Sequence, residues 1–283
     1  MAYEAITYAT DDRVAVLTFN RPERMNALSL ALCDEVQHAV HAADDDPEVR
    51  VLVMTGAGGR AFSAGYDLND QTDAGAPRTV DQCSKRLNQD LRFTYSVWNC
   101  SKPVIAMIDG YCLAGGLELA QMCDIRYASE DSRFGVVETR FAAGIATLAM
   151  PWIIGARSRE LIYSGDMIDA QEALRLGLVN RVFSKQDLLS ETMRMAKRMS
   201  RVALSTLQLN KRAINNTYEA MGIRAALAYA VEAGAIMDAT ESEFKTFYDL
   251  RRTDGIAEAM KWRDSLFAPF ESKSSWKASG EKQ

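Results

Sequence analysis

Short apolar runs and amphipathic helical patterns alternate along the first part of the chain. Runs at residues 14–20, 50–55 and 104–108 have strand length and end at turn residues, which is typical of buried strands. Patterns at residues 29–46 and 80–98 predict amphipathic helices between these strands. Since parallel strands are joined by right-handed helical crossovers, this order predicts an α/β fold with a parallel sheet.

The two ends of the chain depart from this alternation. Residues 4–9 form a short apolar pattern before Asp11-Asp12, which predicts a hairpin with the strand at residues 14–20. Apolar positions after residue 201 recur at helical spacing with few strand signals. The predicted helices there span residues 204–218, 223–237, 241–250 and 253–267. We therefore expect a core of residues 1–200, a helical region of residues 201–268 and a polar, disordered tail of residues 269–283.

The stretch from residue 101 to residue 138 combines a strand, a turn and the start of a helix. Asp109-Gly110 ends the apolar run, and Ala114-Gly115-Gly116 opens a helix that reaches Met122. The first N–H groups of a helix lack partners within it, so they can bind an anion or a charge that develops during a reaction. Glu118 lies in the first turn of this helix, and Glu138 follows the next apolar segments. These two acids are the candidates for acid–base chemistry.

Bulk composition narrows the possible partners. The chain of 283 residues has a formal net charge of −5, whereas a nucleic-acid partner calls for a basic surface. No apolar run reaches the length of a membrane-spanning helix, and the first residues lack the pattern of a secretory signal. We therefore expect a cytoplasmic protein that binds neither nucleic acid nor membrane.

Histidine and cysteine usage excludes several kinds of site. The two histidines, His38 and His41, lie three positions apart on one predicted helix, where a solvated helix face is the ordinary interpretation. Without nearby cysteines or clustered carboxylates they are a poor metal site, so we expect no metal. The five cysteines are scattered, which fits reduced thiols better than a disulfide framework.

The central stretch resembles the enoyl-CoA hydratase/isomerase, or crotonase, family. The resemblance rests on the ordered segments I-A-M-I-D-G, A-G-G, L-E-L-A and M-C-D-I, and on A-F-S-A-G-Y-D-L at residues 61–68. It returns at residues 157–183 and covers the chain from about Tyr3 to Phe267. The resemblance implies a crotonase-like spiral of ββα units followed by a helical C-terminal trimerisation region. It also implies an acyl-CoA partner and a homotrimer or a dimer of trimers.

The resemblance assigns roles to individual residues. Glu118 and Glu138 match the two catalytic glutamates of the family's hydratases, and the backbone N–H groups of Tyr66 and Gly115 match the oxyanion hole. The remaining predicted substrate or CoA contacts are Arg24, Asn26, Ala27, Ala64, Asp67, Leu68, Arg140 and Phe267. Residues 71–78 are expected to form a mobile loop over the site. No cofactor is implied, because coenzyme A is part of the substrate.

These roles predict an enoyl-CoA hydratase that adds water across the 2,3 double bond of a thioester. The rival within the family is an isomerase, hydrolase or decarboxylase that acts on a functionalised acyl-CoA. Isomerases of the family need only one of the two glutamates, so the presence of both favours hydration. The rival outside enzymes is a crotonase-like scaffold or RNA-binding protein without turnover, which the acidic charge and the complete pair of glutamates disfavour.

The segment after Glu138 departs from the family pattern. Residues 139–155 lack the Pro-Gly-x-Gly-Gly turn of straight-chain hydratases and place Arg140 beside the second acid. Arg140 is either an ordinary salt-bridge residue or a contact to a polar or acidic acyl group. A cation there would lower the pKa of Glu138 unless burial offsets it. On the second alternative we expect functionalised or ring-containing enoyl-CoAs to be better substrates than crotonyl-CoA.

Overall fold

The computed structural model describes residues 3–70, 79–240 and 242–270. The loop expected at residues 71–78 lies outside the described residues, as does nearly all of the polar tail expected from residue 269 onward. The predicted outline of the chain is present: a core rich in strands precedes a region whose described residues form helices and no strand.

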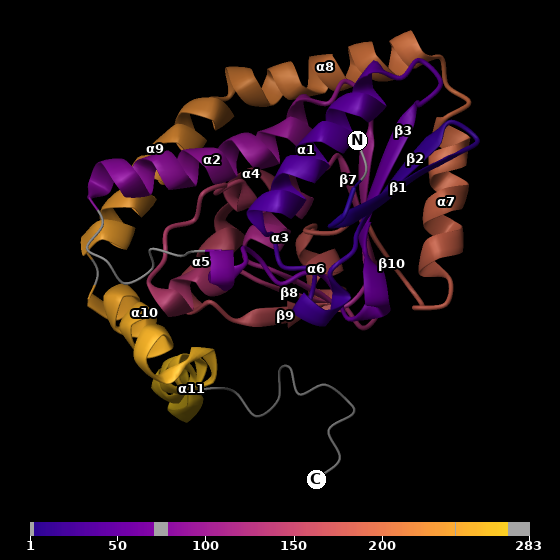
Figure 1. Ribbon diagram of the computed structural model, residues 1–283. Helices are drawn as coiled ribbons and strands as arrows, with labels where there is room; N and C mark the ends of the chain where they lie inside the picture. Colours follow the sequence, from indigo (N-terminus) through magenta and orange to yellow (C-terminus); the bar gives the residue numbers. More distant parts are fainter. Residues whose placement is uncertain (1–2, 71–78, 241, 271–283) are drawn as a thin grey trace.

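A six-stranded sheet forms the centre of the molecule, in the order β1-β2-β3-β5-β7-β10 (Figure 1). Its strands are β1 (Ile6–Asp11), β2 (Val14–Phe19), β3 (Val51–Gly56), β5 (Val104–Ile108), β7 (Ile125–Ser129) and β10 (Arg181–Phe183). The first two strands form the predicted antiparallel hairpin, and the other neighbouring pairs are parallel. The prediction of an α/β fold with a parallel sheet is confirmed.

A second sheet consists of four strands of three residues each, in the order β4-β6-β8-β9. These are β4 (Ala61–Ser63), β6 (Tyr111–Leu113), β8 (Arg133–Gly135) and β9 (Met167–Asp169). Three times in succession the chain leaves the large sheet and enters the small one, from β3 to β4, from β5 to β6 and from β7 to β8. This alternation is the ββα spiral. Strands of three residues are too short to show an alternation of apolar and polar residues, so the sequence does not predict them.

Helices cover both faces of the large sheet (Figure 1). On one face lie α1 (Leu30–Asp45), α2 (Val80–Asn99) and α3 (Gly115–Met122), and on the other lies α7 (Leu188–Met199). The predicted N-cap of α1 is confirmed, because the Ser29 hydroxyl oxygen accepts a hydrogen bond from the Leu32 N–H at 3.2 Å. Two short helices, α4 (Met150–Ile154) and α5 (Ser158–Ser164), lie between β8 and β9, and a third, α6 (Ala170–Leu176), follows β9.

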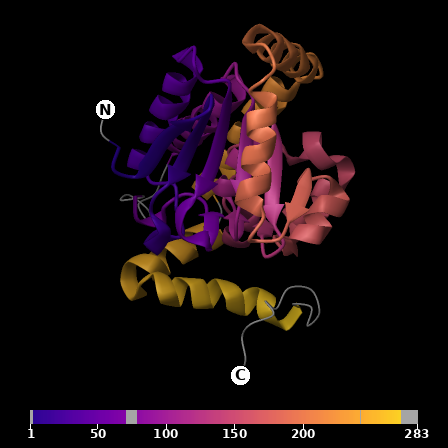
Figure 2. The ribbon, with the colours of Figure 1, turned by 90° about the vertical axis from the view of Figure 1, so that its right-hand side faces the viewer.

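Among the described residues after 203, four α-helices follow one another. They are α8 (Leu204–Ala220), α9 (Ile223–Thr240), α10 (Ser242–Asp254) and α11 (Ile256–Phe267). Leu227 and Val231 of α9 pack against Leu87 and Leu91 of α2 in one apolar cluster. Figure 2 shows α10 and α11 crossing one end of the molecule, below the strands.

No single helix among the described residues is both long and apolar enough to cross a bilayer. The bent pair α8 and α9, with an angle of 58° between them, meets the length and composition criterion only when the two are taken together.

A buried lysine ties α8 to the core. Lys211 is 5% exposed, and its ammonium group lies 2.8 Å from Asp124 Oδ2 and 3.1 Å from the Lys102 carbonyl oxygen. The same Asp124 oxygen accepts a hydrogen bond from the Val104 N–H at 2.7 Å, at the start of β5. One carboxylate therefore joins the first residue of a central strand to the C-terminal helical region.

We expect Lys211→Met to lower the free energy of unfolding by ~1–3 kcal/mol, because Asp124 is left partly buried without its cation. Arg212→Met is the matched control, since Arg212 is the exposed neighbour on the same helix. Its effect should stay within ~0.5 kcal/mol. Urea unfolding monitored by circular dichroism measures both values, and equal stability of the two variants would contradict this account of the ion pair.

Candidate active site

The second sheet places two loops side by side. Because β4 and β6 are parallel neighbours, the loops that follow them leave from the same edge of the sheet. Gly65 in the first loop has φ of 100°, and a Cβ there would lie 2.6 Å from the Ala114 side chain and 3.4 Å from the Gly115 nitrogen. Only glycine allows both this backbone conformation and this close approach.

Two backbone donors in these loops have no acceptor in the described part of the chain. Around Tyr66, Leu28 N–H donates to the Gly65 carbonyl and Asp67 N–H donates to the Leu28 carbonyl, but no hydrogen bond involves the Tyr66 N–H. Gly115 is the first residue of α3, and its N–H has no partner either. Ala114 before it has φ of 50° and ψ of −133°, a rarely populated conformation that costs about 1–3 kcal/mol.

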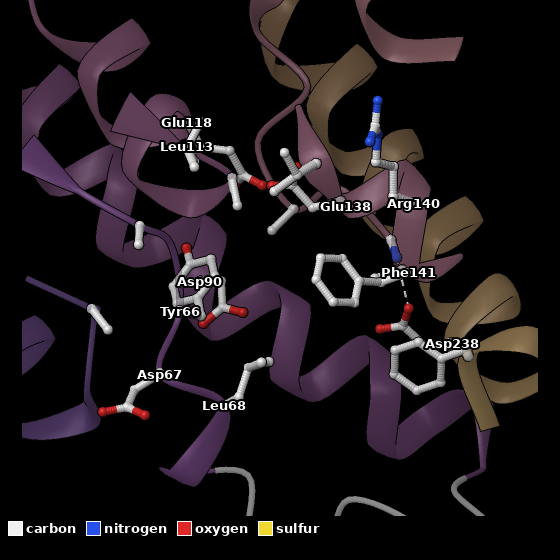
Figure 3. A pocket seen from close by; sticks show the side chains of 18 of the residues that line it. Tyr66, Asp67, Leu68, Asp90, Leu113, Glu118, Glu138, Arg140, Phe141 and Asp238 are labelled. Atoms are coloured by element: carbon white, nitrogen blue, oxygen red, sulfur yellow. Dashed lines mark hydrogen bonds between the residues drawn. The ribbon is translucent and has the colours of Figure 1, made fainter. Parts of the chain in front are cut away.

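The two predicted acids lie close together and face one cavity. Glu118 on α3 is 3% exposed, and Glu138 in the 3₁₀ helix η4 (Val137–Phe141) is 9% exposed. Glu118 Oε2 accepts a hydrogen bond from the Thr147 N–H at 2.8 Å, whereas both Glu138 oxygens lack a partner within the described residues. Figure 3 shows the two carboxyl groups turned toward one another.

Burial raises the pKa of both acids. The Glu118 pKa lies well above its ordinary value, first because of burial and then because of the negative charge of Glu138. Burial raises the pKa of Glu138 to about 7. Two like charges in one dry site cannot both form easily, so the pair retains a proton near neutral pH. One group can then donate a proton while the other accepts one.

A small cavity of about 10 Å³ lies beside the pair, lined by Glu118, Glu138, Gln121, Thr147 and apolar side chains. This volume is close to the smallest that holds one water molecule. The acids are therefore placed on the wall of a space of the right size for a reacting water.

A cavity of about 520 Å³ is lined by both acids and by the Tyr66 loop. Such a volume is typical of small-molecule sites. Most of the predicted substrate and CoA contacts line it, namely Arg24, Ala27, Ala64, Asp67, Leu68 and Arg140. Asp67 forms an ion pair with Arg21 at 2.8 Å and receives the Asn69 N–H, so it holds the loop in place as well as bordering the cavity.

Two predicted contacts lie outside the cavity lining. The Asn26 side chain is buried and donates to the carbonyl oxygens of Ala57 and Ala61 while accepting the Arg21 N–H, so it braces the loop and has no group left for a ligand. Phe267 lies under the Arg140 guanidinium, 4.7 Å from it. From the same helix, Met260 and Arg263 line the cavity instead.

Arg140 forms an ion pair with Asp166 at 2.5 Å. Figure 3 shows its guanidinium turned away from Glu138. Burial sets the Glu138 pKa, and the charge of Arg140 is not among its causes. The structure therefore corresponds to the salt-bridge alternative for this residue, and Arg140 does not lower the Glu138 pKa as the sequence led us to expect.

Four charged residues of the lining were not predicted from the sequence. Besides Arg263 of α11, these are Arg86 and Asp90 of α2 and Asp238 of α9. Asp238 accepts the Gly144 N–H at 2.7 Å (dashed line in Figure 3). Burial raises the pKa of Asp90 to about 7, against the opposing effect of Arg86. The only signal in the sequence is the four-residue spacing of Arg86 and Asp90, which is also common on exposed helix faces.

The described residues contain no group of three histidine, cysteine or acidic side chains placed to hold a metal ion. His38 and His41 lie on the exposed face of α1, as predicted. The five cysteines are buried, and none of them forms a disulfide bond.

Comparison with known proteins decides the family. The family model described as Enoyl-CoA hydratase/isomerase matches residues 9–245. The chain belongs to this family. A crotonyl-CoA hydratase from Syntrophomonas wolfei is 33% identical over 272 residues, which cover 91% of this chain and all of the relative. A short-chain-enoyl-CoA hydratase from Clostridium acetobutylicum is 32% identical over 257 residues, covering 87% and 95%.

Solved structures agree with this assignment. A crystal structure of an enoyl-CoA hydratase/isomerase from Xanthobacter autotrophicus Py2 superposes with a TM-score of 0.90 at 37% identity, covering 96% of this chain and 100% of that one. An enoyl-CoA hydratase from Mycobacterium smegmatis superposes with a TM-score of 0.87 at 28% identity. The crotonase-like fold predicted from the sequence is thereby confirmed.

The raised pKa of Glu138 predicts a pH-dependent cost in stability for this family member. The unfolded carboxyl group ionises near its ordinary value of 4.5 and the folded one near 7. Stability is therefore lost as the pH rises through this range. We expect Glu138→Gln to be more stable than the wild type by ~1–3 kcal/mol at about pH 8, and by much less at about pH 5. Urea unfolding at both pH values measures the difference.

The surface substitution Glu130→Gln removes the same charge from an exposed position and is the control. It should change stability by no more than ~0.5 kcal/mol at either pH. A Glu138→Gln effect that is the same at both pH values would show that Glu138 is not held in its neutral form by burial.

Proposed function

We propose that this protein is an enoyl-CoA hydratase, which adds water across the 2,3 double bond of an enoyl-CoA thioester. The observation that carries the proposal is the buried pair of Glu118 and Glu138 facing one cavity beside two partnerless backbone N–H groups. The relatives named as hydratases support it. An isomerase needs one acid of this kind, so the second buried acid favours hydration.

In this proposal the thioester oxygen accepts hydrogen bonds from the N–H groups of Tyr66 and Gly115. Glu118 removes a proton from a water molecule whose oxygen bonds to Cβ. The double-bond electrons move toward the thioester, and the two N–H groups stabilise the resulting enolate. Glu138 then gives a proton to Cα as the enolate collapses. The proton that Glu118 took from water then passes to Glu138, so both acids end in their starting protonation states.

The proposed reaction needs no cofactor and no metal beyond the coenzyme A of the substrate, because no electron is transferred in it. We also place the protein in the cytoplasm. Its five buried cysteines, none of which forms a disulfide bond, support a reducing compartment, since disulfides are rare there.

We further propose that the chain assembles as a homotrimer or a dimer of trimers. Large apolar side chains on α8, on α9 and in the turn between them are exposed, with Leu209 61%, Met221 61% and Tyr229 77% accessible. Gathered apolar surface of this kind usually marks an interface. Light scattering should give three or six times the chain mass of 31.4 kDa. A monomer mass at micromolar concentration would overturn the proposal.

Removal of either acid tests the catalytic assignment. We expect Glu118→Gln and Glu138→Gln each to lower kcat by about 10²–10⁴, because the amide can neither accept nor release the proton. Binding of acyl-CoA should remain nearly unchanged. Loss of the conjugated thioester's ultraviolet band measures hydration, with crotonyl-CoA and longer enoyl-CoAs as substrates. Full activity in both variants would show that the pair does not carry the reaction.

A further inference from the structure

Several polar side chains line the cavity but take no part in the proposed hydration, and three of them lie close to one another. Arg86 and Asp90 are four residues apart on α2, so they lie on the same face of the helix, and both border the cavity. Tyr66 contributes its backbone N–H to the reaction centre, whereas its hydroxyl group belongs to the same stretch of wall. Figure 3 shows Tyr66 and Asp90 together, across the cavity from Phe141 and Asp238.

These three side chains contact one another but leave hydrogen-bonding capacity unused. Arg86 Nε lies 3.3 Å from Asp90 Oδ2, and the Arg86 guanidinium lies 5.7 Å from the centre of the Tyr66 ring. The Tyr66 hydroxyl oxygen is buried and has no partner within the described residues. Neither Asp90 Oδ1 nor the terminal nitrogens of Arg86 form a hydrogen bond to any described residue.

Unused polar groups at such a depth require an explanation. Asp90 is 8% exposed, and its side chain and that of Arg86 are 11% and 23% exposed. Buried polar groups in folded proteins nearly always have partners, because leaving one unsatisfied costs about 1–3 kcal/mol. The Tyr66 hydroxyl oxygen is such a group. Asp90 Oδ1 and the terminal nitrogens of Arg86 are less deeply covered and belong to the lining of the cavity, where a group on a ligand can form hydrogen bonds with them.

We propose that Arg86, Asp90 and the Tyr66 hydroxyl bind a hydroxyl group carried by the acyl chain of the substrate. This inference rests on the proposed function, because it takes the cavity to hold an acyl-CoA. The hydroxyl oxygen accepts a hydrogen bond from Arg86, and its proton is donated to Asp90 Oδ1 or to the Tyr66 oxygen. A hydroxyl-bearing enoyl-CoA is therefore the substrate class that fits this cavity.

Other acyl groups match the wall less well. A carboxylate could pair with Arg86, and Arg24, Arg140 and Arg263 also line the cavity. It would lie beside Asp90, however, which already shares the Arg86 charge at 3.3 Å, and it has no proton to donate to Asp90 Oδ1. An ammonium group would approach the guanidinium of Arg86. A plain alkyl chain would leave the donors and acceptors without partners and would remove them from water. A hydroxyl group is neutral, and it can both donate a hydrogen bond to Asp90 and accept one from Arg86.

The chain between the thioester and this site also has a suitable environment. Leu87, Ala143 and Ala146 line the cavity beside the polar group, so the methylene groups of an acyl chain would contact apolar surface. Specificity would then come from a polar group at one end of an otherwise apolar channel, the arrangement common in small-molecule sites.

The test measures binding without turnover. Saturated acyl-CoAs have no double bond to hydrate, so calorimetry can compare each one with its analogue of equal length that carries a terminal hydroxyl group. At the chain length that reaches the site, we expect the wild type to bind the hydroxylated form about 10-fold or more tightly, because a hydrogen bond to a charged group is worth about 1.5–3 kcal/mol.

The double variant Arg86→Met/Asp90→Leu replaces the ion pair by apolar groups and leaves no buried charge without a partner. It should lose the preference and bind the plain chain at least as well. Tyr66→Phe, which removes the hydroxyl alone, should reduce the preference in part. The matched control is Asp81→Leu/Lys85→Met, which removes an exposed ion pair with the same four-residue spacing from the same helix and should keep the full preference.

The outcomes separate this inference from the proposed function. Equal binding of both forms at every chain length, or a preference that survives in the double variant, would overturn the hydroxyl site even if the wild type hydrates enoyl-CoAs. A wild type that hydrates no enoyl-CoA but shows the predicted binding pattern would overturn the hydratase proposal and support the site. A circular dichroism spectrum equal to that of the wild type confirms that each variant is folded.

Discussion

The site depends on the burial of two carboxyl groups in one cavity. Removing a carboxylate from water costs several kcal/mol unless partners replace the lost hydration. Glu118 receives one backbone N–H, from Thr147, and Glu138 receives none within the described residues. The resulting rise in pKa gives groups that exchange protons near neutral pH, which exposed glutamates cannot do. The rest of the fold must supply the stability that this arrangement costs.

The small second sheet controls the geometry of the reaction centre. Its parallel strands bring two loops to one edge, and Gly65 allows those loops to approach until an added Cβ would overlap the Ala114 side chain. The strained backbone at Ala114 orients the first N–H of α3 outward. A rigid sheet is suited to this task, because an oxyanion site gains rate only if its donors stay in place.

Beyond the acids the cavity reaches helices that take no part in the chemistry. Arg86 and Asp90 lie on α2, and Asp238 lies on α9, a helix of the C-terminal region. The fold and the acid pair together favour one class of reaction. In our proposal, side chains on these more distant helices select the acyl group of the substrate. For this reason membership of the family does not by itself name a substrate.

By itself, the sequence determined the order of the elements and the candidate acids. Long apolar runs, and capped amphipathic patterns such as Ser29 to residue 46, show the spacing of apolar residues within one short segment, so the sequence predicts them. The ordered motifs around Gly115 indicate the family. Tertiary structure alone decided the three-residue strands, the role of Asn26 as a loop brace and the ion pair that turns Arg140 toward Asp166. It also decided that Arg86 and Asp90 face the cavity. Each of these depends on contacts between segments far apart in the chain, and no local pattern records such contacts.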